Sequence, residues 1–120
     1  MIAWQKAMTL VKEIYELSAG FPADERFGLT AQLRRAAVSI PSNIAEGQGR
    51  AFDKEFARFL SNSMGSLMEV ETQVMIAQDL GFLKKDAAET LLRQTGEIVR
   101  LVNGLMKKLT VTSRAVPDQS

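Results

Sequence analysis

A row of polar side chains lies beside a proline within one amphipathic segment of this chain. At helical spacing the row contains Arg35, Ser39, Ser42 and Glu46, with Asn43 next to Ser42. An arginine and a glutamate can form an ion pair, and hydroxyl or amide groups can hydrogen-bond exposed backbone carbonyls. The chemistry these residue types support is polar recognition, either within the chain or with a partner.

The same segment carries an apolar face that predicts a helix continuing across the proline. This face repeats at i, i+4, i+7 and i+11 through Leu33, Ala37, Ile40 and Ile44. Because Pro41 has no N–H, the Ala37 carbonyl loses its usual partner, at roughly 3 kcal/mol or more in a helix interior. We therefore expect a kinked helix with a polar edge.

Two interpretations of the polar edge remain open, and both can hold together. In one, the hydroxyl and amide groups repair backbone carbonyls exposed at the kink. In the other, the edge is an oligomer interface in which Arg35 and Glu46 pair across chains and fix the register of the helices. The interface residues predicted on this basis are Arg35, Ser39, Pro41, Ser42, Asn43 and Glu46.

The composition argues against catalysis and against membrane insertion. The chain has 120 residues, 46% of them hydrophobic and 24% charged, with no histidine and no cysteine. The usual general base, the commonest metal ligand and the thiolate nucleophile are therefore all missing. No apolar run approaches the roughly 18 residues of a membrane span. We expect a cytoplasmic protein without a signal peptide, a cofactor, a metal or a small-molecule substrate.

Basic residues suggest a second kind of partner. Over residues 83–120 there are seven basic and four acidic residues. A row at i, i+7 and i+14 contains Arg93, Arg100 and Lys107, with Lys108 beside it, and it could follow a phosphate backbone. A solvated outer face is the alternative, which Glu97 within the row favours. The secondary candidates for nucleic-acid contact are Arg34, Arg50, Lys54 and Arg58.

Four helices must position these groups, and no segment has the pattern of a strand. The expected helices cover about 4–18, 23–47, 50–80 and 85–109; the alternative for the second is a break at residues 28–30 with Thr30 capping a shorter helix. The face expected on the first helix, widened by Leu10 and Leu17, consists of Trp4, Ala7, Met8, Val11, Ile14, Tyr15 and Ser18. Short connections favour an all-α, up-down-up-down antiparallel four-helix bundle over residues 1–110, followed by a flexible tail at 111–120.

The predicted helices have more apolar surface than a single bundle covers. The second helix has an extra apolar row through Val38, Pro41 and Ala45. The surplus elsewhere is Leu10, Leu17, Phe52 and Phe59. We take this surplus to indicate self-association, with a wide core face as the alternative.

Glycines and serines allow two further local interpretations. The run 47–50, Gly-Gln-Gly-Arg, is a weak match to a phosphate-binding loop, and Gly47 as a helix C-cap explains it better. In the middle of the third helix, Ser61, Ser63, Gly65 and Ser66 predict close helix packing rather than a ligand pocket.

The segment LRRAAVSIPSNIAEG also carries a family resemblance, together with FPADERFGL before it and EFARFLSNSMGSLMEVETQ after it. It resembles the four-helix-bundle proteins encoded in intervening sequences of bacterial large-subunit ribosomal RNA genes. The match extends from Trp4 to Leu83, and the core Ser39–Gly47 shows no departure; the fourth helix matches only in pattern. The resemblance implies a pentameric ring and no enzyme. It also implies kinship with the accessory variability protein of diversity-generating retroelements, which binds reverse transcriptase and nucleic acid.

We therefore expect a non-enzymatic, homo-oligomeric helical scaffold or adaptor that binds RNA or a reverse-transcriptase-like ribonucleoprotein. The alternative is a protein-interaction module with no affinity for nucleic acid. An enzyme that uses Arg35 and Glu46 at a subunit interface is a third and weaker hypothesis.

Overall fold

The helical periodicity of the sequence produces four long α-helices. The structure is a computed structural model that describes residues 1–115, with side chains described through residue 110. The helices are α1 (Ile2–Ser18), α2 (Leu29–Gln48), α3 (Asp53–Asp79) and α4 (Lys85–Ala115), and a 3-10 turn covers Ala23–Glu25. Among these described residues there is no strand, so the expected all-α class is confirmed.

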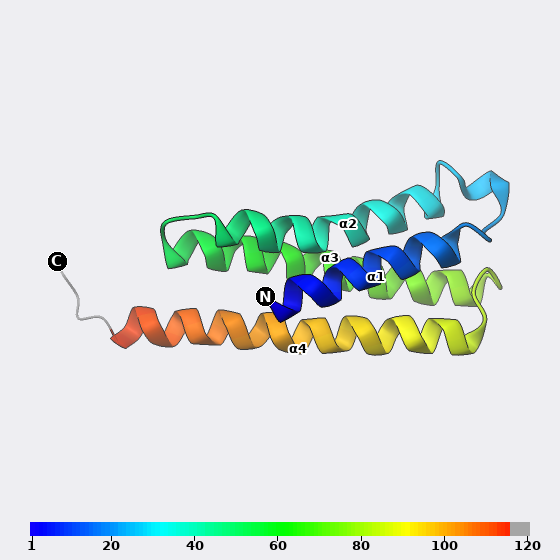
Figure 1. The fold of residues 1–120 in the computed structure, drawn as a ribbon. Coiled ribbons are helices and arrows are strands. Elements are labelled where there is room, and N and C mark those ends of the chain that lie inside the picture. Colours follow the sequence, from blue (N-terminus) through cyan, green and yellow to red (C-terminus); the bar gives the residue numbers. More distant parts are fainter. Residues whose placement is uncertain (116–120) are drawn as a thin grey trace.

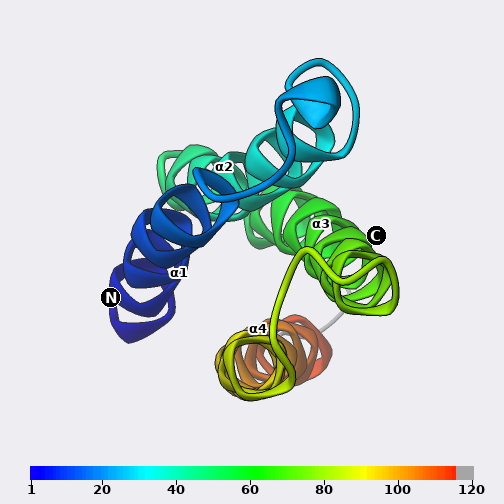
Figure 2. The ribbon, with the colours of Figure 1, turned by 90° about the vertical axis from the view of Figure 1, so that its right-hand side faces the viewer.

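Successive helices run in alternating directions along one long axis (Figure 1). α2 packs against both α1 and α3, and α4 packs against α3 and α1. Viewed along the axis, the four helices surround a common centre (Figure 2). Fully buried side chains from every helix fill this centre, among them Leu10, Ile40, Leu67 and Ile98. The architecture is therefore a four-helix bundle with one apolar core.

The core-facing side of α1 differs from the expected one. The buried residues are Ala3, Ala7, Leu10 and Ile14, whereas Trp4 and Met8 remain 37% and 45% exposed. The expected face is confirmed at Ala7, Ile14 and Ser18, but it was wrong for its larger residues, because periodicity alone does not say which of two adjacent apolar rows faces the core. The small alanines face inward, so the larger aromatic and thioether groups are left on the surface.

The start of α2 also corrects the sequence prediction. The second helix does not begin at residue 23, because the chain breaks at Gly28 and α2 starts at Leu29. Thr30 does not cap it. Instead, the Leu29 N–H donates to Glu25 Oε1 at 3.0 Å, so a side chain from the preceding turn satisfies the first helical donor. α2 then stays helical across Pro41, and the kink angle remains a prediction.

The ends of α2 and α3 use their glycines differently. Gly81 has φ +80°, and the Phe82 N–H donates to the Ala77 carbonyl at 2.8 Å, which closes a Schellman motif at the end of α3. Gly47, in contrast, is a buried residue inside α2, and the C-cap is Gly49. The predicted C-cap role of Gly47 is therefore wrong.

The helices differ in length, and the difference accumulates at one end of the bundle. α1 has 17 residues, α3 has 27 and α4 has 31. The α1–α2 and α3–α4 connections lie at the same end, so α1 begins near the middle of the long axis (Figure 1). α4 also continues past the expected limit of residue 110 to Ala115, and the rest of the expected tail lies outside the described residues.

Candidate functional site

Side-chain donors surround the backbone next to Pro41. Ser39 Oγ donates to the Ala36 carbonyl at 2.7 Å, and Ser42 Oγ donates to the Val38 carbonyl at 2.8 Å. The amide of Asn43 donates to the Ser39 carbonyl at 2.8 Å. Three residues of the predicted polar edge thus bond to the backbone of their own helix, but none of them reaches the Ala37 carbonyl that Pro41 leaves without its usual donor.

Two serines of α3 extend this network from the neighbouring helix. Ser63 Oγ donates to the Ile40 carbonyl at 2.9 Å, and Ser66 Oγ is in hydrogen-bond contact with Ser39 Oγ. Ser63 is fully buried and Ser66 is nearly so. These two positions confirm the close-packing interpretation of the small residues, whereas Ser61 and Gly65 lie on the surface.

Gly47 provides close approach between α2 and α3. A Cβ placed on this residue would lie 2.8 Å from Phe56 Cδ1 and 2.8 Å from Phe59 Cβ. No real side chain tolerates that distance, so the residue must be glycine for α2 to contact the first turns of α3. The motif from Ser39 to Gly47 therefore fixes how α2 sits on α3.

The charged ends of the polar edge do not pair with each other in one subunit. Arg35 and Glu46 are eleven residues apart, which is about 16 Å along a helix. Glu46 Oε1 instead contacts Arg50 Nη2 at 3.3 Å. Arg35 is exposed and lines a polar groove between α2 and α3 with a volume of about 340 Å³, opposite Glu69. The predicted pairing across chains stays a prediction.

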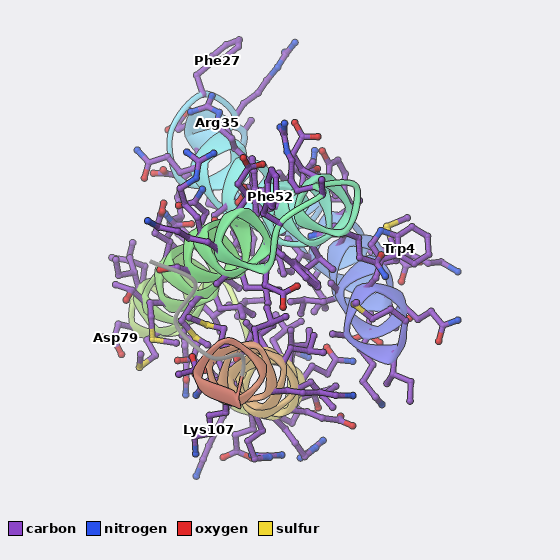
Figure 3. All side chains as sticks on the ribbon, turned by 90° about the vertical axis from the view of Figure 1, so that its left-hand side faces the viewer. Trp4, Phe27, Arg35, Phe52, Asp79 and Lys107 are labelled. Carbon is purple, nitrogen blue, oxygen red and sulfur yellow. The ribbon has the colours of Figure 1, made fainter. Side chains whose placement is uncertain are left out.

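An apolar groove of about 320 Å³ lies on the outer side of α1 and α2. Its apolar walls are Trp4 and Met8 of α1 and Val38, Pro41 and Ala45 of α2. Figure 3 shows Trp4 on the flank formed by α1. We call these five residues the α1–α2 groove; they include the predicted extra row of α2, but not the whole predicted surplus.

The rest of the predicted surplus is mostly buried. Leu10 belongs to the core, and Leu17 is half-buried against it. Phe59 is half-buried beneath arginines, and only Phe52 is largely exposed, at 69%. A wide core face therefore explains Leu10 and Leu17, as the alternative interpretation held.

A second exposed apolar surface lies on α3. Its members, Met68, Met75, Ile76 and Leu80, are each more than 40% exposed. Asp79, on the same part of α3, lies on the flank opposite Trp4 (Figure 3). We call this set the α3 patch. The bundle thus carries two different apolar surfaces on separate flanks.

The side chain of Arg34, one of the secondary candidates for nucleic-acid contact, is held by contacts with α1. Its Nε donates to Ser18 Oγ at 2.8 Å, and its Nη2 donates to the Tyr15 carbonyl at 3.1 Å. Its guanidinium also lies 4.5 Å from the centre of the Tyr15 ring. Arg34 therefore joins α2 to the end of α1 and is poorly available for a phosphate.

The other secondary candidates lie around the α2–α3 turn. The guanidinium groups of Arg50 and Arg58 each lie 4.9 Å from the Phe59 ring centre. Lys54 lies one helical turn before Arg58 and lines the same shallow depression. Three acidic residues, Glu46, Asp53 and Glu55, share this segment with the three cations, so its formal charge is balanced.

The basic row of α4 lies on the outside of the bundle. Arg93, Arg100 and Lys107 are exposed, and Lys107 points away from the other helices (Figure 3). Arg93 Nη2 contacts Thr90 Oγ1 at 3.4 Å, and Lys108 is exposed beside the row. Glu97, the acidic residue within the row, forms an ion pair with Lys6 of α1 at 2.7 Å. The hydrogen bond and charge of Lys6, with a smaller effect of Arg100, lower the pKa of Glu97.

No group of histidine, cysteine or carboxylate side chains able to hold a metal ion occurs within the described part of the chain. Of the helices described, none has the combination of length and apolar sequence needed to cross a membrane.

Sequence analysis missed residues that depend on the pairing of helices. It did not identify Ser63 as the partner of Ile40, nor Glu97 as the partner of Lys6. It also placed Trp4 and Met8 in the core. The signal available for these last two was the run of small residues, Ala3 and Ala7, one position away on the same helix.

The fold places this protein in the class of all-α four-helix bundles. Within it, serine and asparagine side chains make hydrogen bonds to the proline-containing helix α2. The family model for the 23S rRNA-intervening sequence protein matches residues 1–104, and the chain belongs to this family. Among curated proteins, none matches.

A solved structure has the same fold. It is the crystal structure of a protein of unknown function from the S23 ribosomal protein family of Bacteroides thetaiotaomicron. The two structures superpose with a TM-score of 0.82 at 19% sequence identity, over 88% of this chain and 98% of the other. This likeness confirms the fold that the resemblance implied.

Proposed function

We propose that this protein is a non-enzymatic scaffold that assembles from several copies of itself. The observation that carries the proposal is the presence of two different exposed apolar surfaces, the α1–α2 groove and the α3 patch. Contiguous exposed apolar surface is unfavourable in water and marks sites of association. Methionine, which both surfaces contain, and aromatic residues such as Trp4 of the groove are enriched where proteins meet.

The placement of the two surfaces favours a ring. A two-fold dimer uses one surface twice, whereas a head-to-tail contact joins two different surfaces and closes when the rotation between subunits permits. Trp4 and the α3 helix lie on opposite flanks of the bundle, which suits a head-to-tail contact (Figure 3). The family resemblance points to five subunits, so the expected particle has five times the 13.3 kDa mass of the chain.

The polar edge of α2 lies between these surfaces and supports the same assembly. Within the described residues, Arg35 makes no ion pair, while Glu46 has a single partner at 3.3 Å. An interface that brings these groups of neighbouring copies together would set the register of otherwise apolar contacts. We propose no reaction for them, because about 16 Å of helix separates them within a subunit.

Mixing two complementary variants tests the head-to-tail contact. Trp4→Glu places a carboxylate in the α1–α2 groove, and Met75→Glu places one in the α3 patch; a charge buried in an apolar contact opposes association. We expect each variant alone to be a single subunit by light scattering. An equimolar mixture should give a one-to-one pair, because one intact groove then meets one intact patch.

Thr9→Glu is the matched control, since it adds the same charge to an exposed position of α1 outside the groove. It should keep the mass of the unmodified particle. If the unmodified protein is a single subunit at micromolar concentration, the scaffold proposal is wrong. If the mixture stays unpaired although both variants alone are dissociated, the contact is not head-to-tail.

A second candidate function, contact with RNA, rests on the outer face of α4. Over residues 98–110 this helix carries Arg100, Lys107 and Lys108 and no acidic residue. Arg93, Arg100 and Lys107 follow one line along the helix, as phosphate contacts require. We propose that the assembled scaffold presents this face to an RNA or a ribonucleoprotein; a purely protein-binding scaffold would lack this affinity.

A further inference from the structure

A cleft opens beside the first turn of α1, on the side of α4. Its volume is about 320 Å³. Residues of α1, including Ile2, form one wall, and α4 forms the other with Arg100, Leu101, Gly104, Leu105 and Lys108. This cleft is separate from the α1–α2 groove and from the α3 patch.

The cleft exists because α1 is shorter than its neighbours. α1 has 17 residues and α3 has 27, so at 1.5 Å per residue α1 falls short by about 15 Å. Both helices reach the end that holds the α1–α2 connection, so the shortfall lies at the opposite end (Figure 1). There α2, α3 and α4 continue while the fourth corner of the bundle has no helix of this subunit.

The surface of α4 at this corner has the form of a helix-packing surface. Leu101 and Leu105 are one turn apart and only half-buried, and Ile2 at the end of α1 is 60% exposed. Gly104 lies between the two leucines, and a Cβ placed on it meets nothing within 4 Å. A glycine with open space above it allows a second helix to approach the backbone closely.

Charge decides which kind of helix fits. The charged side chains among those lining the cleft are Arg100 and Lys108, and no described carboxylate lines it. The nearest acidic residue of α4, Glu97, is already paired with Lys6 at 2.7 Å. The apolar floor with a cationic rim therefore complements an apolar stripe flanked by carboxylates.

We propose that this cleft binds an acidic amphipathic helix of a partner protein, which continues the line of α1 along α4. Apolar residues of the partner, one turn apart, pack on Leu101 and Leu105, and its carboxylates meet the Arg100 side of the cleft. This site goes beyond self-association, because it uses neither of the two surfaces assigned to the contact between copies.

A plugging variant with a matched control tests the site. Gly104→Trp fills the cleft, and Gly65→Trp makes the same change at an exposed glycine in the middle of α3, where a Cβ also meets nothing within 4 Å. Both replace a glycine inside a helix, so neither should lower helix stability. The probe is a fluorescein-labelled, alanine-based peptide of about 14 residues, long enough for marginal helix formation, with leucine at i and i+4 and glutamates flanking this stripe.

We expect the unmodified full-length protein to bind this peptide and not its lysine counterpart. Gly104→Trp should weaken binding by about tenfold or more, as the loss of a central contact does, while Gly65→Trp should leave it unchanged. Arg100→Glu should abolish the preference for the glutamate peptide, because the new carboxylate balances the charge of Lys108 in the lining. This last variant keeps the cleft open, so it tests the charge argument independently of the plug.

Three results would overturn the proposal. The first is equal binding of the two peptides, or binding of neither. The second is a changed particle mass for Gly104→Trp with Gly65→Trp unaffected, which would make the cleft a contact between copies. The third is binding of an RNA oligonucleotide to the unmodified protein and to Gly65→Trp, but not to Gly104→Trp. This result would assign the cleft to nucleic acid. Failure of self-assembly itself appears instead as a single-subunit mass of the unmodified protein, whatever its peptide binding.

Discussion

At the scale of single residues, side-chain hydrogen bonds surround Pro41, but the Ala37 carbonyl, which faces the donor that proline lacks, receives none of them. Of the five carbonyls from Ala36 to Ile40, four accept a hydrogen bond from a side chain. One of these donors, Ser63, comes from another helix. Because the bond from Ser63 depends on the position of α3, the network also fixes how far α3 can slide along α2.

Ser63→Ala should lower the free energy of unfolding. The substitution removes the donor to a buried carbonyl at Ile40, and such a loss costs about 1–3 kcal/mol. Chemical denaturation followed by circular dichroism measures the change. Ser61→Ala, at an exposed position of the same helix, should change stability by less than about 0.5 kcal/mol. Equal effects of the two variants would contradict the role of Ser63.

Glu97 should titrate below the ordinary range of a glutamate, because Lys6 lowers its pKa. A carboxyl with a lowered folded pKa stabilises the fold above its unfolded pKa, and this contribution is lost as the pH falls through the folded pKa. Lys6→Ala should therefore raise the pKa of Glu97, as measured by carbon NMR of the side-chain carboxyl. Lys12→Ala on the same helix should have no such effect, and an unchanged titration in Lys6→Ala would refute the pairing.

The sequence predicted which kinds of hydrogen bond the polar edge makes, but it did not predict which residues of other helices take part. Serine and asparagine beside a proline predict backbone repair, because these residue types hydrogen-bond to carbonyls within their own helix. The bond from Ser63 to Ile40 joins residues 23 positions apart, and the packing of α2 on α3 sets it. The availability of Arg34 also depended on packing, since Ser18 and Tyr15 of α1 hold it.

At the scale of the helices, side-chain size decides which helices come close. Gly47 lets α2 touch Phe56 and Phe59 at the start of α3, and buried serines allow contact further along. The small Ala3 and Ala7 turn α1 inward and leave Trp4 outside. Close packing of small residues thus creates the exposed apolar groove from which we infer association.

Gly47→Ala should destabilise the protein, although alanine favours helix formation. The added Cβ would lie 2.8 Å from atoms of two phenylalanines, so α2 and α3 must separate. Gly65→Ala makes the same change where nothing lies within 4 Å, and it should stabilise by about 1 kcal/mol. Thermal unfolding of the two variants should therefore shift in opposite directions, and parallel shifts would contradict the close-approach role.

The helices themselves were largely predictable, whereas their ends and faces were less so. The apolar stripe of α3 is buried as its periodicity predicted, through Leu60, Leu67, Val70 and Val74. The break before α2 lies where the alternative prediction placed it, at residues 28–30, but the bond from Glu25 in place of a Thr30 cap was not predictable. The buried face of α1 was predicted only in part, because both of its candidate faces are apolar.

At the scale of the whole molecule, the apolar surfaces and the basic row lie on different sides of the bundle. The α1–α2 groove and the α3 patch lie on opposite flanks, and the basic row of α4 lies on a third side (Figure 3). A ring that joins the two apolar flanks would leave the α4 face of every copy accessible. Repetition of one cationic face around a ring would strengthen binding to a long polyanion through several weak contacts.

Binding to single-stranded RNA should weaken steeply with salt, and the α4 row should carry much of that dependence. Each phosphate contact contributes about 0.7 to the slope of log affinity against log salt concentration. Replacing Arg93, Arg100 and Lys107 with alanine should therefore reduce the slope by about 2 per subunit in contact. Fluorescence anisotropy between 50 and 200 mM salt measures it.

The control for this measurement replaces Lys12, Lys84 and Lys85, which are exposed and lie outside the row. It removes the same charge and should leave the slope nearly unchanged. Equal effects of the two triple variants would indicate general attraction rather than a contact at the row. No binding by the unmodified protein at low salt would favour the purely protein-binding alternative.

The contact between Phe21 and Phe82 has a mechanical consequence. These rings, 5.8 Å apart, join the α1–α2 connection to the α3–α4 connection at one end of the bundle. Away from this end, the Lys6–Glu97 ion pair at 2.7 Å also joins α1 to α4. Separation of these two helices would therefore have to break the ion pair as well as their shared core, while Ser63 continues to bond α3 to α2.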